Sequence, residues 1–199
     1  MTLQARLTVR SALAVLLVGI VLSLTAKAAP PAVRLSDLDN RFVDPFLASE
    51  GAVAVVFLFA SVECPISNRY APEVRRLHVT FASKGVAFWL VYPNPAESGD
   101  AIRRHVAAFA YPTRALRDPQ HLLVKATNAT VTPEAAVFDS KRRLVYHGRI
   151  DNRYVNVGLE RPAATKHDLE DVLSAIVAGR PVGEATAPAV GCFIADFVQ

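Results

Sequence analysis

The feature that most constrains the fold is a junction between an apolar segment and a cysteine followed by proline. The apolar run, Val53–Ala60, ends in a short polar turn that leads to Cys64 and Pro65. A run of this length that is rich in valine and phenylalanine is typical of a buried strand. Proline is favoured as the first residue of a helix, because its missing N–H would have no partner there. The sequence therefore places Cys64 where a central strand gives way to a helix, and the free N–H groups of a helix start favour the reactive thiolate.

The first 28 residues have the order of a cleavable leader peptide. Arg6 and Arg10 precede a mostly apolar run, Ser11–Leu24, and Ala26-Lys27-Ala28 then supplies the small residues that a signal peptidase accepts. We expect residues 1–28 to be a signal peptide cut after Ala28, which predicts a periplasmic or secreted protein. The apolar run is short for a membrane span, which needs about 20 residues. An uncleaved N-terminal anchor is the alternative, and a membrane partner is expected only in that case.

The charge of the chain argues against a nucleic-acid-binding protein. Removing the leader takes away three basic residues and no acidic residue, which lowers the formal net charge from +4 to +1. A nucleic-acid surface needs clustered positive charge, and the single Trp89 and the scattered aromatic residues form no stacking platform. Two cysteines, Cys64 and Cys192, are too few for a disulfide scaffold. In an oxidising compartment, however, two thiols either pair or react.

The remaining pattern predicts alternating strands and helices. Apolar runs predict strands, and apolar residues at spacings of three and four predict helices. The expected elements are a short hairpin within residues 34–51, a strand Val53–Ala60, a helix Cys64–Lys84 kinked near Pro72, a strand Val86–Tyr92, a helix Ala96–Ala110, a short strand Arg114–Leu116, a helix Pro119–Asn128, an antiparallel hairpin Ala135–Asp139 and Arg143–Arg149, and a helix Thr165–Ala178 capped by Thr165.

This order of elements predicts an α/β domain over residues 29–180. The parallel pair and the hairpin imply a mixed central β-sheet flanked by helices on both faces. Residues 181–199 are rich in proline, glycine and alanine and contain Cys192. We expect these last residues to form a flexible C-terminal tail.

Together these features resemble the thioredoxin-like superfamily, and within it the AhpC/TSA redoxin group of peroxiredoxin-like and TlpA-like proteins. The stretch Glu63-Cys64-Pro65-Ile66-Ser67 occupies the place of the family's Cys-x-x-Cys motif. Thr132-Pro133 precedes the expected hairpin, as the family's cis-proline loop does. The resemblance covers residues 34–180, and it implies a thioredoxin-like fold and a thiol oxidoreductase activity.

The chain departs from the motifs of both main activities in this group. Ser67 replaces the second cysteine of the dithiol reductases, so the motif is a monothiol Cys-Pro-Ile-Ser. Ser61 matches the hydroxyl residue that peroxiredoxins carry three positions before their reactive cysteine, but Phe57 replaces the proline of that motif. The loop at Thr132-Pro133 also lacks the arginine that peroxiredoxins place there. No complete motif of either enzyme is present.

Cys64 is the expected catalytic residue, and its two sequence neighbours have candidate roles. Ser67 lies one helical turn after Cys64, which places its hydroxyl to hydrogen-bond the thiolate or leaves it on the helix surface. Glu63 is either a proton acceptor for the thiol or a solvated turn residue.

Further roles follow from the resemblance. A cysteine in a C-terminal tail is how some peroxiredoxins resolve a sulfenic acid, which makes Cys192 the candidate resolving residue. A free thiol, or a disulfide to another molecule, is the alternative for Cys192. In the family, the cis-proline loop presents its backbone to a partner polypeptide, so Thr132, Pro133 and Pro65 are the expected partner-binding residues.

We expect Cys64 to attack a peroxide or a disulfide, with Cys192 or an external thiol as the resolving group. The expected partners are a thiol or disulfide protein, or a peroxide, together with an external thiol reductant. No cofactor and no metal ion are expected. Two other classes remain open: a non-catalytic thioredoxin-fold binding module that holds a partner on the Cys64 face, and a copper-delivery protein of the Sco type. In the latter, Cys192 would supply the ligand that Ser67 cannot.

Overall fold

The structure is a computed structural model that describes residues 33–183 and 185–195, so the leader expected at residues 1–28 lies outside the described residues. Its strands are β1 (Leu35–Asp37), β2 (Phe42–Val43), β3 (Ala54–Phe59), β4 (Val86–Tyr92), β5 (Arg114–Arg117), β6 (Val131–Thr132), β7 (Glu134–Asp139), β8 (Leu144–Gly148), β9 (Tyr154–Asn156), β10 (Leu159–Glu160), β11 (Thr186–Ala187) and β12 (Cys192–Phe193). Its helices are α1 (Pro65–Arg69), α2 (Ala71–Phe81), the short 3-10 helix η1 (Ala82–Lys84), α3 (Gly99–Ala108), α4 (Leu122–Thr127) and α5 (Asp168–Val177). Within the described ranges, no helix is long and apolar enough to cross a membrane.

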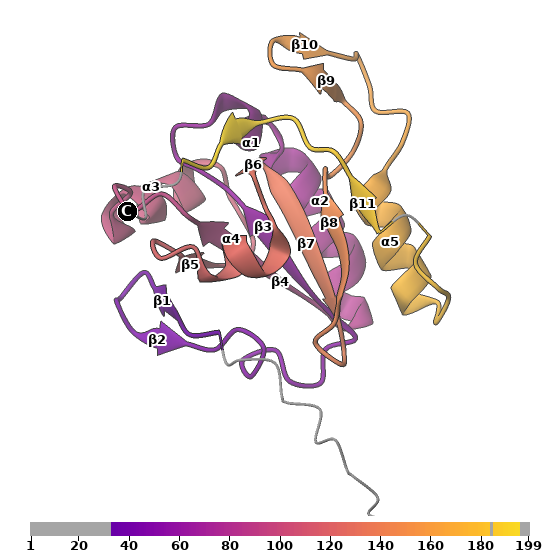
Figure 1. The fold of residues 1–199 in the computed structure, drawn as a ribbon, viewed down its shortest axis with the longest axis horizontal. Helices are drawn as coiled ribbons and strands as arrows, with labels where there is room; N and C mark the ends of the chain where they lie inside the picture. The colour runs from indigo at the N-terminus through magenta and orange to yellow at the C-terminus, as the bar shows by residue number, and fades with distance from the viewer. Residues whose placement is uncertain (1–32, 184, 196–199) are drawn as a thin grey trace, which may run out of the picture.

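A mixed sheet of eight strands forms the centre of the molecule (Figure 1). The strands follow the order β11-β8-β7-β3-β4-β5-β1-β2. Strands β3, β4 and β5 are parallel to one another, whereas β7 is antiparallel to both β3 and β8. The predicted mixed sheet is confirmed, and both the parallel pair and the hairpin lie where the sequence places them.

Helices cover both faces of the sheet because β3 is apolar and buried at every position. Alternate residues of a strand point to opposite faces. Accordingly, Val56 and Leu58 enter one buried cluster, and Phe57 and Phe59 enter another. The first cluster also holds buried residues of α2, α3 and α5, and the second holds those of α4. Phe57 therefore lies in the core, where its ring meets Phe46 and Phe138 edge to face.

Pro72 divides the predicted helix as expected. Helix α1 ends at Arg69, and α2 begins at Ala71 with Pro72 in its first turn. A proline in the first turn leaves no hydrogen bond unmade, because that N–H would have no helical partner. The restart at this proline keeps the helix that carries Cys64 short and separate from the longer α2.

The last helix begins later than the sequence predicts. Thr165 was expected to be its N-cap, but α5 begins at Asp168. The carbonyl oxygen of the Asn152 side chain accepts hydrogen bonds from the backbone N–H groups of Thr165 and Lys166, and the Asn152 amide donates one to the Thr165 hydroxyl. The capping prediction was wrong because these bonds hold the Thr165 segment in a non-helical loop.

The C-terminal tail, expected to be flexible, lies along the sheet in the residues that the structure describes. Strand β11 joins the sheet as a parallel neighbour of β8, pairing Ala187 with Gly148. Gly148 permits this approach, because a Cβ atom there would lie only 2.1 Å from the carbonyl oxygen of Ala187. Figure 1 shows the tail, in yellow, continuing from β11 across the end of the sheet toward α1 and β6. The tail residues 185–195 are thus part of the fold that surrounds Cys64.

Candidate functional site

Cys64 lies at the junction that the sequence predicts, as the N-cap of α1. Its backbone is extended, and its sulfur accepts a hydrogen bond of 3.4 Å from the backbone N–H of Ser67. Pro65 is the first residue of α1 and is exposed. The Cys64 side chain itself is only 1% exposed. A cysteine at this position combines a favourable helix start with almost complete burial, so access to its sulfur depends on the residues that cover it.

Thr132 brings the two cysteines of the chain together. The Cys64 thiol donates a hydrogen bond of 2.9 Å to the carbonyl oxygen of Thr132. The peptide bond between Thr132 and Pro133 is cis. Strand β12 pairs antiparallel with β6, and its register sets Cys192 directly opposite Thr132. Two thiols that are far apart in the sequence therefore meet at one residue of the Thr132-Pro133 loop.

The environment of Cys192 differs from that of Cys64. Both cysteines are free thiols, but Cys64 is buried and Cys192 is partly exposed. Burial raises the pKa of the Cys192 thiol to about 12, and a hydrogen bond and charge repulsion from Cys64 add to that increase. A cavity of about 80 Å³ lies beside Cys192, and its other lining residues are Ser61, Pro93, Asn94, Thr132, Phe193, Ile194 and Ala195. Cys192 therefore lines this cavity, and Cys64 does not.

A buried carboxylate, Glu97, holds the turn that precedes Cys64. Its Oε1 atom accepts hydrogen bonds from the hydroxyl of Ser61, at 2.7 Å, and from the backbone N–H of Val62, at 2.8 Å. Its other oxygen, Oε2, is buried and has no hydrogen-bond partner among the residues that the structure describes. Burial raises the pKa of Glu97, and the nearby charge of the exposed Glu63 contributes in the same direction. The turn is thus fixed by an acid whose charged form is disfavoured.

A second set of hydrogen bonds reaches the same turn from the other side. The Asn68 side chain donates to the carbonyl oxygen of Val62 at 3.2 Å, which leaves its own oxygen to accept from Nε2 of His105 at 2.6 Å. The other ring nitrogen of His105, Nδ1, then accepts from the hydroxyl of Tyr92 at 2.9 Å. This arrangement requires the neutral imidazole, and burial lowers the pKa of His105 accordingly.

The structure brings most of the candidate site residues together. Cys64, Thr132, Pro133 and Cys192 lie together, with Pro65 at the edge of the group. Ser67 contacts the sulfur through its backbone N–H. The sequence predicted either a hydroxyl bonded to the thiolate or a serine on the helix surface, and the second alternative was wrong because Ser67 is buried. Glu63 is exposed, and its role as a proton acceptor stays a prediction.

Sequence reasoning missed Glu97, Asn68 and His105. One signal was available for Glu97, because it follows β4 just as Ser61 follows β3, and these strands are parallel neighbours. The carboxyl ends of adjacent parallel strands meet at one edge of a sheet. Asn68 and His105 carried no such signal, since their pairing depends on how α1 and α3 pack.

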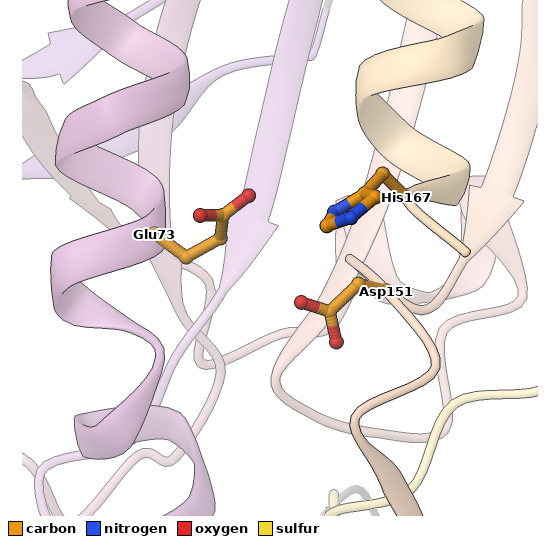
Figure 2. A group of neighbouring side chains, drawn as sticks. All are labelled: Glu73, Asp151 and His167. Carbon is orange, nitrogen blue, oxygen red and sulfur yellow. The ribbon is translucent and has the colours of Figure 1, made fainter. Parts of the chain in front are cut away.

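One group of possible metal ligands occurs among the described residues, away from the cysteines. Glu73, Asp151 and His167 have ligand atoms within 4.8 Å of one another, and Figure 2 shows their side chains facing one another between α2 and the start of α5. Both oxygens of Glu73 already accept hydrogen bonds from Arg76. One oxygen of Asp151 accepts from the hydroxyl of Tyr70 and from a backbone N–H. Protein donors therefore already engage three of the four carboxylate oxygens of this group.

Comparison with known families identifies the chain. The family model described as Redoxin matches residues 25–165, which is most of the sequence. The chain belongs to the Redoxin family. A search of curated proteins found no match for this redoxin.

Solved structures agree with this family. An uncharacterized conserved protein from Geobacillus kaustophilus is 28% identical, with a TM-score of 0.74 over 86% of this chain and 91% of that one. A hypothetical protein from Sinorhizobium meliloti 1021 is 26% identical, with a TM-score of 0.71 over 81% of this chain and 89% of that one. A secreted disulfide oxidoreductase from Mycobacterium tuberculosis is 18% identical, with a TM-score of 0.51 over 74% of this chain and 96% of that one. The redoxin therefore has a thioredoxin-like fold.

Proposed function

We propose that this redoxin is an exported thiol oxidoreductase in which Cys64 and Cys192 form one redox pair. The observation that carries the proposal is the β6–β12 register, which sets Cys192 opposite the residue whose carbonyl oxygen binds the Cys64 thiol. The Cys-Pro-Ile-Ser motif has a single thiol, and a tail cysteine supplies the second one from another part of the chain. Export rests on the leader pattern of residues 1–28 alone.

The proposed reaction uses a peroxide as the oxidant and begins at Cys64. The Cys64 thiolate attacks one peroxide oxygen, so that an S–O bond forms and the O–O bond breaks. The leaving oxygen takes up a proton as an alcohol or water, and Cys64 becomes a sulfenic acid. The Cys192 thiolate then attacks the Cys64 sulfur, which forms the disulfide and releases the sulfenic oxygen as water. Two equivalents of an external thiol return both cysteines to the reduced state and leave as a disulfide.

The contrast between the two thiols suits this order of events. Cys64 accepts the N–H of Ser67 at the start of α1, whereas the raised pKa of Cys192 keeps that thiol protonated at neutral pH. Part of the raised pKa comes from the charge of Cys64, and a neutral sulfenic acid carries no such charge. Oxidation of Cys64 is therefore expected to make Cys192 easier to deprotonate when its thiolate is needed.

The two other classes have less support. A copper site would need a histidine beside the cysteines, and within the described part of the chain no three-ligand group includes either Cys64 or Cys192. A non-catalytic binding module would not require two thiols at one backbone residue.

Trapping of the sulfenic acid tests the proposal. The reduced protein is treated with hydrogen peroxide in the presence of dimedone, and the products are identified by mass spectrometry. We expect a Cys64–Cys192 disulfide in the wild type, and a dimedone adduct on Cys64 that accumulates only in Cys192→Ser. The Cys64→Ser variant is the control and should form neither product. If the wild type forms no disulfide and Cys192→Ser forms no adduct, and neither protein forms a mixed disulfide with glutathione, the proposal is wrong.

A further inference from the structure

The tail lies over the Cys64 sulfur and limits the access of substrates to this atom, which is the one proposed to react. Cys64 is only 1% exposed, and Thr132, which faces it, is 2% exposed. The cavity beside Thr132 and Cys192, at about 80 Å³, holds molecules of the size of a peroxide or a few waters. A polypeptide does not fit in this space. While β12 is in place, a protein disulfide has no route to Cys64.

Strand β12 is held in the way that a separate peptide would be held. Its residues pair antiparallel with β6, and the backbone N–H of Ile194 donates to the carbonyl oxygen of Thr130 at 2.9 Å. Strands β6 and β12 form a two-stranded sheet of their own. Pairing of an extended peptide with an exposed backbone segment is a general mode of recognition, in which backbone bonds give affinity and alternate side chains give specificity. Cys192 and Ile194 contact the two core clusters, while Phe193 between them is 86% exposed.

Gly191 sets a strict condition on what can lie along this edge. The residue is buried, and a Cβ atom added to it would lie 2.2 Å from the carbonyl oxygen of Thr132 and 2.7 Å from its carbon. Backbone atoms cannot move aside as a flexible side chain can. Any segment that places a cysteine opposite Thr132 in this register must therefore have glycine just before that cysteine.

In the family, the loop equivalent to Thr132-Pro133 presents its backbone to a partner polypeptide. We propose that the chain's own Gly191–Ile194 is the resident occupant of this edge, at Val131–Thr132, and that the edge selects an external polypeptide of the pattern glycine, cysteine, any residue, apolar residue. The pattern follows from the buried glycine, the cysteine facing Cys64, the exposed Phe193 and the inward Ile194. The tail and an external polypeptide compete for one surface. With the tail bound, the site admits small oxidants, and with the tail released, it admits protein disulfides.

The inference rests on the proposed reactivity of Cys64 and adds a second substrate class to it. Once the tail has left, the Cys64 thiolate attacks the sulfur of a disulfide that an incoming polypeptide has placed where Cys192 was. The new bond joins Cys64 to the polypeptide cysteine, the original S–S bond breaks, and its other sulfur leaves as a thiolate. The tether from β11 keeps the detached tail close, so that Cys192 can later displace the polypeptide.

The experiment compares two full-length proteins that have Cys64 as their single thiol. One is Cys192→Ser, in which the tail can still pair with β6, and the other adds Gly191→Val, which prevents that pairing. Each is reacted with a short peptide, Ala-Val-Gly-Cys-Phe-Ile, whose cysteine carries a chromogenic aromatic thiol as a mixed disulfide. The release of the aromatic thiol is followed by absorbance. A second peptide with valine in place of glycine, and a mixed disulfide of the same thiol with mercaptoethanol, serve as comparison substrates.

We expect the Gly191→Val protein to react with the glycine peptide about tenfold faster, if the tail of its parent covers the edge about nine-tenths of the time. The valine peptide should show no such gain relative to the small disulfide. Gly183→Val is the matched control, because a Cβ atom at Gly183 meets nothing within 4 Å. Should Gly191→Val fail to fold, Ile194→Ser releases the tail by weakening its apolar anchor.

The outcomes separate this inference from the proposed function. If releasing the tail raises the reaction rates of both peptides and of the small disulfide equally, the tail only shields Cys64, and the proposed binding surface is wrong. Equal rates in the parent and the released-tail protein would overturn the competition. A Cys64 that reacts with none of the disulfides and with no peroxide in either protein would instead count against the proposed function itself.

Discussion

Glu97 offers a sharp test of how the turn before Cys64 is held. Replacing it with alanine removes the acceptor for the Ser61 hydroxyl and the Val62 N–H. Each buried donor left without a partner costs about 1–3 kcal/mol. The Ser61 hydroxyl can rotate toward the adjacent cavity, so the larger cost falls on Val62. We expect Glu97→Ala to lower the free energy of unfolding by about 1–3 kcal/mol.

Glu97→Gln separates the hydrogen bonds from the charge. The glutamine oxygen can still accept both bonds, but it has no ionised form. Because burial raises the pKa of Glu97, its stabilising contribution is complete below its ordinary value of 4.5 and is lost as the pH rises through the folded-state pKa. The glutamine variant has no such loss. Its unfolding free energy, relative to wild type, should therefore rise from low to high pH.

Urea unfolding of the reduced proteins at several pH values measures this difference. Glu63→Gln is the matched control, because Glu63 lies in the same turn and is exposed. Each unit of pKa shift corresponds to about 1.4 kcal/mol, so even a modest shift is measurable. A difference between Glu97→Gln and wild type that stays constant with pH, or falls as the pH rises, would refute the account of a buried acid with a disfavoured charge.

Three further predictions follow from the same structure. An NMR titration should find His105 still neutral at pH values just below its ordinary pKa of 6.5. The free energy of unfolding should fall as the pH drops below 6.5, because the histidine of the unfolded chain takes up a proton before that of the folded protein. A His105 that titrates at or above 6.5 would contradict the hydrogen-bond assignment. Because burial raises its pKa to about 12, the Cys192 thiol should be alkylated by iodoacetamide about tenfold more slowly in the folded, reduced protein than in urea, which is the limit set by a tail that is released about one-tenth of the time. Comparable rates would show that Cys192 is not buried beside Cys64. Gly148→Ala should detach β11 and speed that alkylation, because its Cβ atom would lie 2.1 Å from the carbonyl oxygen of Ala187. Gly158→Ala should not, because Gly158 also has a positive φ but a Cβ atom there meets nothing within 4 Å. Equal alkylation rates in these two variants would show that β11 does not position the rest of the tail.

Local sequence patterns were sufficient for the frame of the fold. The run Val53–Ala60 predicted a strand buried on both faces, and the structure has β3 in the centre of the sheet. The Cys64-Pro65 step predicted a helix start, and Pro72 predicted the break that follows. In each case the residues that determine the element lie within a few positions of it in the sequence. Patterns of that kind can be read from one stretch of sequence.

The contacts that complete the site have causes that are distant in the sequence. Ser61 and Glu97 are 36 positions apart, and Cys64 and Thr132 are 68 apart, so each pairing depends on the assembled sheet. At Thr165 the local pattern predicted a helix cap, but the side chain of Asn152, which is distant in the sequence, binds the Thr165 backbone and prevents it. Composition also gave the wrong expectation for the tail, because Gly191 allows a close backbone approach to Thr132 and does not make the segment flexible.

The position of β11 affects whether release of β12 would expose an unpaired edge of the central sheet. It forms one outer edge of the eight-stranded sheet, and β8 beside it would otherwise present unpaired backbone groups to solvent. Such an edge is a template for pairing with another molecule, and it is a common origin of aggregation. Because β11 and β12 are separate strands joined by Pro188–Gly191, β12 can leave β6 while β11 stays in place. In the competition that we propose, the tail therefore exposes the Cys64 thiol while β11 continues to cover the edge of the sheet.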